Sequence, residues 1–318
     1  MSEGALPVAA LVAEMAAMLA PSLGDEALTE ARELLALMHD QPRHWPSLAR
    51  DVVLGAPACD AARHAARRRA SGAPMQYAAG RAAFRHFTLD VDERVLIPRP
   101  ETEQLVDIVL ERTRDERGGV AVDVGTGSGA IAMSLASEGR FARVIGTDVS
   151  LDALAVARAN ADRFAGRWCA VLELRHGSLL GPVPETGLRA IVSNPPYISF
   201  GEAAALPASV RDWEPAVSLF SAQDGMAATT QLVRDAAAAL APRGVLALEV
   251  DMRRAAAVAE LASLHGAYED VHVIRDLTGR ERFVVARRRE DQDDRGQGEG
   301  ARPAHRAERG IQGSQARQ

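Results

Sequence analysis

Four consecutive residues, Asn194-Pro195-Pro196-Tyr197, have the types and spacing to hold a flat amino group. They follow the apolar run 188–193, which predicts a buried strand. Two successive prolines fix two φ angles and remove two backbone donors, so the segment can neither continue a sheet nor begin an ordinary helical turn. The oxygens of such a rigid corner can accept the hydrogens of a planar NH2 group while the tyrosine ring covers its face. A proline-stiffened loop is the alternative interpretation.

A glycine-rich loop lies upstream of this corner. Gly125-Thr126-Gly127-Ser128-Gly129 follows the predicted strand 120–124 and precedes a predicted helix. Gly125 permits the tight turn, Gly127 lets a ligand approach the backbone, and small residues at 129 and 130 permit close helix packing. The same spacing satisfies the dinucleotide fingerprint, so the loop alone fits either an NAD enzyme or an S-adenosyl-L-methionine (SAM) enzyme. A purely structural turn is disfavoured by the strand–helix context.

Polar residues also end the next two predicted strands. Asp148 lies 19 residues beyond Gly129, and its carboxylate can accept two hydrogen bonds from ribose hydroxyls. Capping of the following helix is the alternative role for Asp148, but Ser150 is better placed for it. After the third strand, Ser178 could bond an adenine edge and Leu179 could cover its face. An ordinary turn fits these two residues nearly as well.

The elements that must position these residues alternate between strand and helix patterns, which predicts a parallel, doubly wound α/β sheet. The predicted strands are 120–124, 144–147, 170–174, 188–193, 245–250, 271–274 and 283–286, and the predicted helices are 130–137, 151–164, 225–240 and 255–264. The connection 275–282 is too short for a parallel crossover, so we expect an open seven-stranded sheet with a reversed edge strand. All four candidate groups follow carboxyl ends of successive strands, where open α/β sheets bind ligands.

The remainder of the chain divides by pattern into three further parts. Residues 1–80 show apolar residues at helical spacing, punctuated by prolines, and predict a small helical domain. Residues 81–98 alternate with a period of two on either side of Asp92-Glu93, which predicts a β-hairpin connector to the α/β domain, 99–289. Residues 290–318 are rich in Glu, Asp, Arg, Gln and Gly and predict a disordered tail.

Composition limits the classes of function. The 318 residues carry a net charge of -6, which argues against non-specific nucleic-acid binding as the main activity. All 37 basic residues are arginine, so lysine-based covalent chemistry is excluded. Cys59 and Cys169 fit a reducing compartment, and we expect both to be buried and neither to bind a metal. The amino terminus resembles neither a signal peptide nor a membrane-spanning helix, so we expect a cytoplasmic protein with no membrane partner.

The glycine loop and the proline corner together resemble class I SAM-dependent methyltransferases that modify planar NH2 groups. Further segments, within residues 61–288, resemble more specifically the release factor glutamine N5-methyltransferases, the PrmC/HemK family. These segments are Leu96-Ile97-Pro98-Arg99-Pro100-Glu101-Thr102-Glu103, Ser193 to Ile198, Glu214-Pro215 with Leu219-Phe220, Asp224-Gly225, and Asp276-Leu277-Thr278-Gly279-Arg280-Glu281-Arg282.

The resemblance implies a helical, substrate-recognising N-terminal domain joined by a β-hairpin to a seven-stranded, Rossmann-like catalytic domain. It implies methyl transfer from SAM, without a metal, to the glutamine of a Gly-Gly-Gln motif in class 1 peptide chain release factors, with S-adenosyl-L-homocysteine as product. By position, SAM would be held by Gly125, Thr126, Gly127, Ser128, Gly129, Asp148, Ser178, Leu179 and Asn194, and the substrate by Asn194, Pro195, Pro196 and Tyr197. Asn194, Pro195 and Tyr197 would be catalytic. One departure is Ser178, where relatives often have an acidic residue. We expect a monomer that does not contact nucleic acid directly.

Three other enzyme classes and one non-enzyme compete with this interpretation. A glutamine methyltransferase of a ribosomal protein and an adenine-N6 nucleic-acid methyltransferase share the Asn-Pro-Pro-Tyr corner. The adenine enzyme would need a basic groove or a target-recognition domain, which the net charge and the small helical appendage disfavour. An NAD-dependent oxidoreductase leaves the corner unexplained. A binding module that merely keeps the fold is disfavoured because the glycines, Asp148 and the corner are all present.

Two groups of charged residues remain open. Arg99, Glu101 and Glu103 either order a loop over SAM or form structural ion pairs. The arginines at 63 and 67–69 either dock an acidic or RNA-proximal face of a protein partner or form a solvated helix face.

Overall fold

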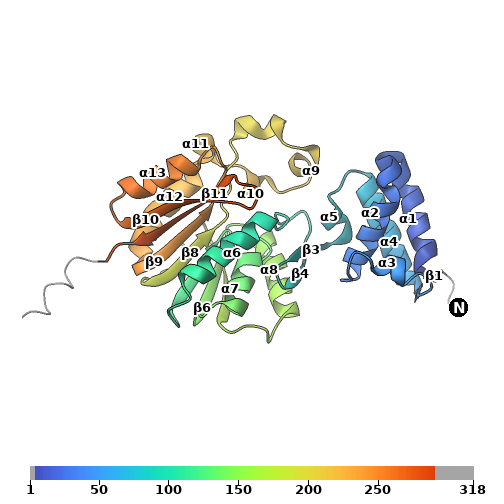
Figure 1. Ribbon diagram of the computed structural model, residues 1–318, viewed down its shortest axis with the longest axis horizontal. Helices are drawn as coiled ribbons and strands as arrows, with labels where there is room; N and C mark the ends of the chain where they lie inside the picture. Colours follow the sequence, from blue (N-terminus) through green and yellow to red (C-terminus); the bar gives the residue numbers. More distant parts are fainter. Residues whose placement is uncertain (1–3, 291–318) are drawn as a thin grey trace, which may run out of the picture.

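The amino-terminal helices pack around an apolar core of their own (Figure 1). The computed structural model describes residues 4–290, so the predicted tail lies outside the described residues except for Glu290. This part contains β1 (Leu6–Pro7), α1 (Val8–Leu23), η1 (Gly24–Glu26), α2 (Ala27–Met38), α3 (Trp45–Leu48), β2 (Val53–Leu54), α4 (Ala56–Ala70) and α5 (Met75–Ala79). Leu11, Met15, Leu34 and Leu35 are fully buried between the helices, as the helical spacing of apolar residues predicts.

One stretch of the described chain, Val8–Met38, has the length and hydropathy of a membrane-crossing helix. It consists of two helices of 16 and 12 residues separated by the short turn η1, and the two lie side by side (Figure 1). Each is shorter than the ~20 residues that a membrane span requires. The apolar character of this stretch is therefore that of helices that bury one face against their neighbours.

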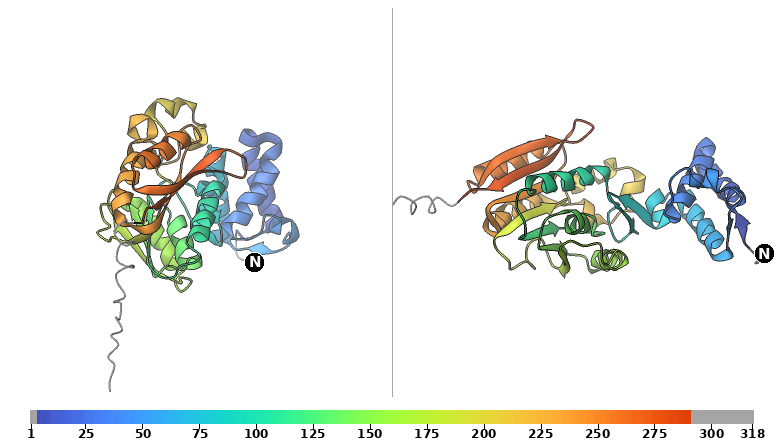
Figure 2. Two further views of the ribbon diagram at one scale, coloured as in Figure 1. Left: turned by 60° about the vertical axis from the view of Figure 1, so that its left-hand side comes forward. Right: turned by 60° about the horizontal axis from the view of Figure 1, so that its bottom comes forward.

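A β-hairpin joins the helical part to the sheet (Figure 2). It consists of β3 (Arg81–Phe84) and β4 (Phe87–Asp90), paired antiparallel with Phe84 opposite Phe87. The hairpin turn lies at Arg85-His86. A turn also forms after Asp92, closed by a hydrogen bond from Val95 N to the Asp92 carbonyl oxygen at 3.1 Å, but it joins no paired strands, so the predicted position of the hairpin turn was wrong. Arg85 has a φ of +50°, a conformation that glycine or asparagine adopts more readily than arginine. Because an arginine occupies this position, no residue type there predicts a turn.

Seven strands form one sheet in the order β10-β11-β9-β8-β5-β6-β7. They are β5 (Val120–Val124), β6 (Arg143–Asp148), β7 (Val171–His176), β8 (Leu188–Ser193), β9 (Leu240–Glu249), β10 (Tyr268–Arg275) and β11 (Glu281–Arg288). Strands β5 to β9 pair in parallel, whereas β11 runs antiparallel to both of its neighbours. The predicted mixed sheet with reversal at its β10–β11 end is confirmed, with β11 as the reversed strand and β10 outermost.

Helices cover both faces of the sheet and bury two apolar cores (Figures 1 and 2). The helices are α6 (Pro100–Arg112), α7 (Ala130–Glu138), α8 (Leu151–Arg163), α12 (Ala227–Ala239) and α13 (Ala255–Leu264). On one face Leu105, Leu135 and Val156 meet alternate residues of the strands, and on the other Leu232 and Val258 do so. Burial on both faces explains the nearly continuous apolar runs of the central strands.

Two cysteines test the expectation of burial. Cys59 in α4 is buried, but Cys169 is exposed, so the expectation was wrong for Cys169. That residue lies in the connection between α8 and β7, where the chain passes over the surface rather than through a core.

Candidate active site

A cavity of about 390 Å³ lies at the carboxyl ends of four adjacent parallel strands. Every one of the four groups singled out from the sequence contributes to its wall. The lining residues from these strand ends are Gly125 and Gly127 after β5, Asp148 and Val149 after β6, Gly177, Ser178 and Leu179 after β7, and Asn194, Pro195 and Pro196 after β8. The sheet edge thus brings together residues that are up to 71 positions apart, from 125 to 196.

The glycine loop leaves space for a ligand where its sequence predicts it. Gly125, Gly127 and Gly129 have φ values of +75°, +54° and +85°. A Cβ atom placed on Gly125 or Gly127 would meet no protein atom within 4 Å, whereas one on Gly129 would contact Ala157 and Met133. The first two glycines therefore keep the backbone open toward the cavity, and the third permits close packing of α7 on α8.

Asp148 links the loop to the start of α8. One carboxylate oxygen accepts a hydrogen bond from Gly127 N at 2.9 Å, and the other accepts one from Ser150 N at 2.9 Å. Ser150 caps the helix, because its hydroxyl accepts from Ala153 N at 3.1 Å. The carboxylate lines the cavity and retains acceptor capacity, since each oxygen has more than one lone pair.

The third strand end places Ser178 and Leu179 on the cavity wall. Leu179 has a φ of +49°, and its carbonyl oxygen accepts a hydrogen bond from Thr147 Oγ1 at 2.9 Å. A side-chain hydroxyl on β6 thus holds this turn in a conformation that leucine seldom adopts.

The proline corner has its first three residues on the cavity wall. Asn194 Nδ2 donates a hydrogen bond to Thr102 Oγ1 at 3.2 Å, and Asn194 Oδ1 accepts none from residues 4–290. Tyr197 is not among the residues that line the cavity. Burial raises the pKa of Tyr197 to about 12, and the charge of Glu249 adds to this shift while that of Arg282 opposes it. A position of the Tyr197 ring beside a bound substrate therefore stays a prediction.

A second, smaller cavity of about 50 Å³ adjoins the first and shares Leu96, Gly125, Gly127 and Asn194 with it. Thr126, Ser128, Arg99 and Thr102 line only this smaller space, while Gly129 lines neither. Of the predicted cofactor residues, Thr126 and Ser128 thus lie on the side of the loop that faces α6.

A further wall comes from residues 199–226, which we call the flap. It contains η2 (Phe200–Ala205), α9 (Ala208–Arg211), α10 (Ala216–Leu219) and α11 (Ala222–Gly225), and contributes Val217, Ser218, Phe220, Ser221 and Ala222 to the cavity. Ile198 and Phe220 form a parallel bridge, so the proline corner and the flap are held together by main-chain hydrogen bonds.

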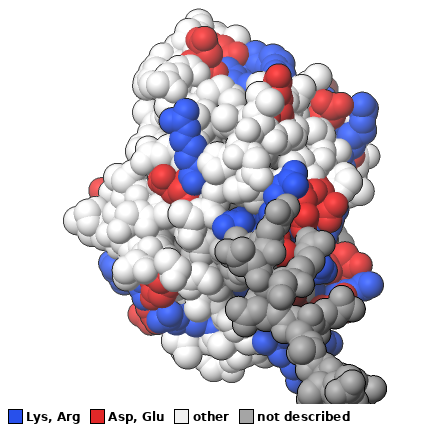
Figure 3. Space-filling view, turned by 90° about the vertical axis from the view of Figure 1, so that its left-hand side faces the viewer, with Lys and Arg blue, Asp and Glu red and all other residues white. Residues whose placement is uncertain are grey.

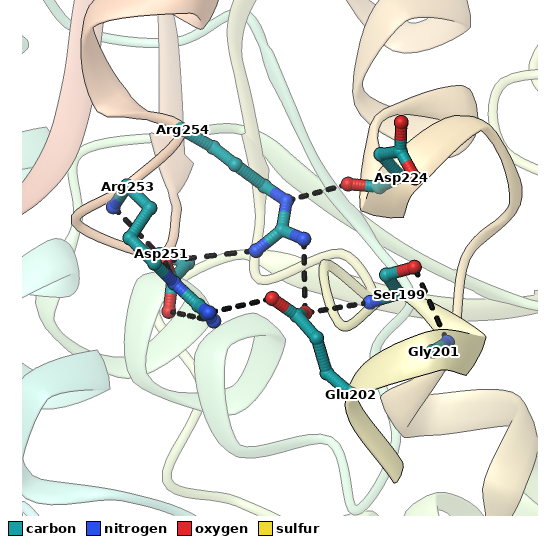
Figure 4. A network of polar contacts seen from close by, with 7 residues as sticks. All are labelled: Ser199, Gly201, Glu202, Asp224, Asp251, Arg253 and Arg254. Atoms are coloured by element: carbon teal, nitrogen blue, oxygen red, sulfur yellow. Dashed lines mark hydrogen bonds and ion pairs between the residues drawn. The ribbon is translucent and has the colours of Figure 1, made fainter. Parts of the chain in front are cut away.

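A network of charges ties the flap to the loop after β9 (Figure 4). Arg254 donates from Nε to the Asp224 carbonyl oxygen at 2.7 Å and from Nη2 to Glu202 at 2.9 Å. Arg253 pairs with both Glu202 and Asp251. A hydrogen bond from Ser199 N and the arginines lower the pKa of Glu202, so this carboxylate stays charged at neutral pH.

An ion pair and a hydrogen bond account for two of the three residues whose role the sequence left open, Arg99 and Glu103. Arg99 pairs with Glu214 of the flap at 2.5 Å, and burial raises the pKa of Glu214 despite this partner. Glu103 accepts from the backbone N–H of Arg85 at 3.0 Å and so holds the hairpin turn against α6. Arg99 borders the smaller cavity, whereas Glu103 is structural.

Sequence reasoning missed three buried polar residues around the site. Asp123 lies under the glycine loop, accepts hydrogen bonds from Thr126 and Ala132, and has its pKa raised to about 7 by burial. Asn160 joins the hairpin at Asp90 to the loop at Ser128. Glu249 is the last residue of β9, so the strand-end rule that found the other groups would also have found it.

The charged surface shows mixed rather than basic character. Three of the four α4 arginines have partners within the described chain: Arg63 with Glu14 and Asp60, Arg68 with Glu93, and Arg69 with Glu30. On the face shown in Figure 3, basic and acidic side chains are interspersed. Among residues 4–290, no three His, Cys, Asp or Glu side chains gather in a way that could hold a metal ion.

Comparison with known proteins adds a family context. Residues 101–207 match the family described as the methyltransferase small domain. The release factor glutamine methyltransferase of Moorella thermoacetica is 43% identical over 224 residues, which cover 70% of this chain and 78% of that protein. That of Gloeobacter violaceus is 42% identical over 212 residues, covering 67% and 73%. A solved structure of a methyltransferase from Pyrococcus furiosus is 20% identical, with a TM-score of 0.47, over 64% of this chain and 89% of that one.

Proposed function

The chain belongs to the family of release factor glutamine methyltransferases, and from that premise we propose the reaction that its cavity performs. The proposed reaction transfers a methyl group from SAM to the side-chain amide nitrogen of the glutamine in the Gly-Gly-Gln motif of class 1 peptide chain release factors. The observation that carries this proposal is the shared cavity, in which the glycine loop and Asp148 face the Asn194–Pro196 corner.

The residues that line the cavity fit SAM. Its volume of about 390 Å³ is within the range of small-ligand sites, and the open backbone at Gly125 and Gly127 leaves room for the ligand to lie against the loop. Asp148 would accept hydrogen bonds from the ribose hydroxyls, and Ser178 and Leu179 would border the adenine. When bound, SAM supplies the methyl group, whose bond to sulfur breaks as its bond to the amide nitrogen forms, and it leaves as S-adenosyl-L-homocysteine.

The protein's part of the chemistry is placement and electrostatics. An amide nitrogen is a weak nucleophile, because its lone pair is delocalised into the carbonyl group. We assign Asn194 Oδ1 and the Pro195 carbonyl oxygen as acceptors of the two amide hydrogens, which would turn the nitrogen toward the methyl group. The same two oxygens would stabilise the positive charge that develops on nitrogen. Tyr197 would flank the amide plane, and the proton would leave to water after transfer.

The remaining parts of the molecule have supporting roles in this proposal. Residues 1–80 would recognise the release factor, and residues 99–289 would carry out the methyl transfer. The hairpin region 81–98 would connect these two parts. Cytoplasmic location and a monomeric state complete the proposal.

Methyl transfer from labelled SAM to a panel of acceptors tests the substrate class. We expect label on an intact release factor and none on the same factor with the glutamine of its Gly-Gly-Gln motif replaced by asparagine. Double-stranded DNA and ribosomal proteins should remain unlabelled. Label on DNA would favour an adenine-N6 methyltransferase instead, and label on a ribosomal protein would favour the other glutamine-modifying class.

A further inference from the structure

A chain of hydrogen bonds runs from the proline corner into the buried interior. Asn194 Nδ2 donates to Thr102 Oγ1 at 3.2 Å, and Thr102 Oγ1 donates to Glu249 Oε2 at 2.7 Å. Asn194 directly follows β8, Thr102 lies in α6 and Glu249 ends β9, and these elements are far apart in sequence. Thr102 is 5% exposed and Glu249 2% exposed, so water has little access to the inner part of this chain.

The direction of these bonds follows from the number of hydrogens that each group has. An ionised carboxylate can only accept, and a threonine hydroxyl has a single hydrogen to donate. When Thr102 gives that hydrogen to Glu249, it presents only a lone pair to Asn194. That lone pair can be satisfied by the NH2 end of the asparagine amide and not by its oxygen. Asn194 Oδ1 is then left without a partner from residues 4–290, on a residue that lines both cavities.

We propose that Thr102 and Glu249 are positioning residues that hold the Asn194 amide with its oxygen free to accept a hydrogen from the substrate amide. Neither residue touches the substrate in this proposal. Ionised Glu249 fixes the direction in which Thr102 donates, and Thr102 fixes the orientation of Asn194. Protonated Glu249 could instead donate to Thr102, whose own hydrogen would then be available to Asn194 Oδ1. We call the hydrogen-bonded chain of Asn194, Thr102 and Glu249 the relay. In this second state the Thr102 hydroxyl would compete with the substrate amide for Asn194 Oδ1.

The surroundings of Glu249 allow its carboxyl group to change between the ionised and protonated forms near neutral pH. Burial raises the pKa of Glu249 to about 7, and Glu101 at the start of α6 adds to this shift. The hydrogen bond from Thr102 and the charges of Arg282 on β11 and Arg99 before α6 oppose it. Burial raises the pKa of Tyr197 to about 12, with the charge of Glu249 adding to the shift, so this hydroxyl stays neutral.

Side-chain NMR can follow this relay directly, because Asn160 and Asn194 are the only two asparagines in the chain. Selective ¹⁵N labelling of asparagine side chains therefore gives two NH2 signals, which Asn160→Asp assigns. We expect the Asn194 signal of the full-length protein to titrate with a midpoint near the pKa of Glu249, about 7. Thr102→Val and Glu249→Gln should each abolish that titration, while Thr102→Ser keeps it. The pH dependence of the Asn160 signal should be the same in the wild type and in the three Thr102 and Glu249 variants.

Kinetics supply a second readout, which rests on the proposed function. Thr102→Val should lower kcat about tenfold, as expected for loss of one orienting hydrogen bond, with KM for SAM little changed. Thr102→Ser keeps the hydroxyl and should retain most of kcat. The double variant Thr102→Val/Glu249→Gln should be no worse than the more impaired single variant, because the two residues act in series.

Two results would overturn the relay. The first is an Asn194 signal that titrates identically in the wild type and in Thr102→Val. The second is an additive loss of kcat in the double variant. An inactive wild type would instead count against the proposed function, and the NMR titration would still decide the relay, because it needs neither SAM nor substrate.

Discussion

Single residues around the cavity owe their properties mainly to burial. Asp123 is fully buried at the end of β5, where Thr126 and Ala132 donate to one of its oxygens and no group within residues 4–290 donates to the other. The loss of solvation raises its pKa to about 7, against an ordinary value of 3.8. Its place beneath the glycine loop and its bonds to Thr126 and Ala132 make it a support for the backbone of that loop.

Asp123 should make stability depend on pH in a definite direction. Because its pKa is raised in the folded state, its favourable contribution is present below the unfolded pKa of 3.8 and is lost as pH rises through about 7. The free energy of unfolding in urea should therefore fall between about pH 4 and pH 7 and level off above that, and it should fall less in Asp123→Asn.

Asp115→Asn is the matched control, since the Asp115 side chain is 91% exposed. It should show the full pH dependence of the wild type. If the free energy of unfolding of Asp123→Asn depends on pH in the same way as that of the wild type and Asp115→Asn, Asp123 does not titrate in this range. Some dependence should remain in every variant, because Glu249 is buried in the same way.

The residues at the ends of strands could be predicted from the sequence, and the buried supports largely could not. Asp148, Ser178, Leu179 and Asn194 follow recognisable strand patterns, so the carboxyl-edge rule places them. Asn160 lies in the last turn of α8, and only the packing of that helix against the hairpin reveals its hydrogen bonds. Thr102 lies in a segment singled out by family resemblance, but its contacts with Asn194 and Glu249 depend on three elements meeting.

At the scale of elements, the flap and the proline corner are built against one another. Gln223, Asp224 and Gly225 have three successive positive φ values of 52°, 52° and 84°. A Cβ atom on Gly225 would come within 2.1 Å of the Tyr197 carbonyl oxygen. Glycine is therefore required here both for its conformation and for the close approach of two backbones. The arginine network in Figure 4 holds the same segment from the other side.

Gly225→Ala should displace the proline corner and lower both stability and activity. We expect a loss of about 1–3 kcal/mol in the free energy of unfolding, together with a large fall in kcat. Gly279→Ala is a matched control, because Gly279 has the same φ of +84° but no atom within 4 Å of an added Cβ. It should lose stability from backbone strain and keep its activity. Equal activity in the two variants would show that the contact at Tyr197 does not matter for the site.

The bounds of some elements could be predicted from the sequence, and those of others could not. The helix 255–264 and the strands 120–124 and 188–193 have the predicted bounds. The position of the hairpin turn was predicted wrongly because Arg85 adopts a positive φ, which its residue type does not predict. The flap was not predicted as an element at all, since its short helices carry no sustained period and its form depends on ion pairs with distant residues.

At the scale of the whole molecule, a helical bundle and an α/β unit are joined by a hairpin (Figure 2). The arginines of α4 were candidates for docking a partner, but three of the four are engaged with acidic residues of this chain. Arg67 is exposed and forms no ion pair within residues 4–290. The structure therefore favours a solvated, internally paired helix face over a docking surface at this helix.

Charge reversal separates these two interpretations. Arg67→Glu should leave KM for an intact release factor within about twofold of the wild-type value, because a single exposed charge contributes little. Arg63→Glu should lower the melting temperature, since it replaces two ion pairs by repulsion between the new carboxylate and those of Glu14 and Asp60. A rise in KM for the intact factor in Arg67→Glu, without a rise for a short Gly-Gly-Gln peptide, would restore the docking interpretation.

The central claim is that Asn194 presents an oxygen to a substrate amide beside bound SAM, and the Asn194→Ala variant tests it most directly. Turnover with the release factor and SAM affinity by calorimetry should be measured on the same protein. We expect kcat to fall by about 10²–10³-fold, as for loss of one acceptor in a preorganised site, while SAM affinity stays within about threefold. Undiminished turnover at unchanged SAM affinity would contradict the claim.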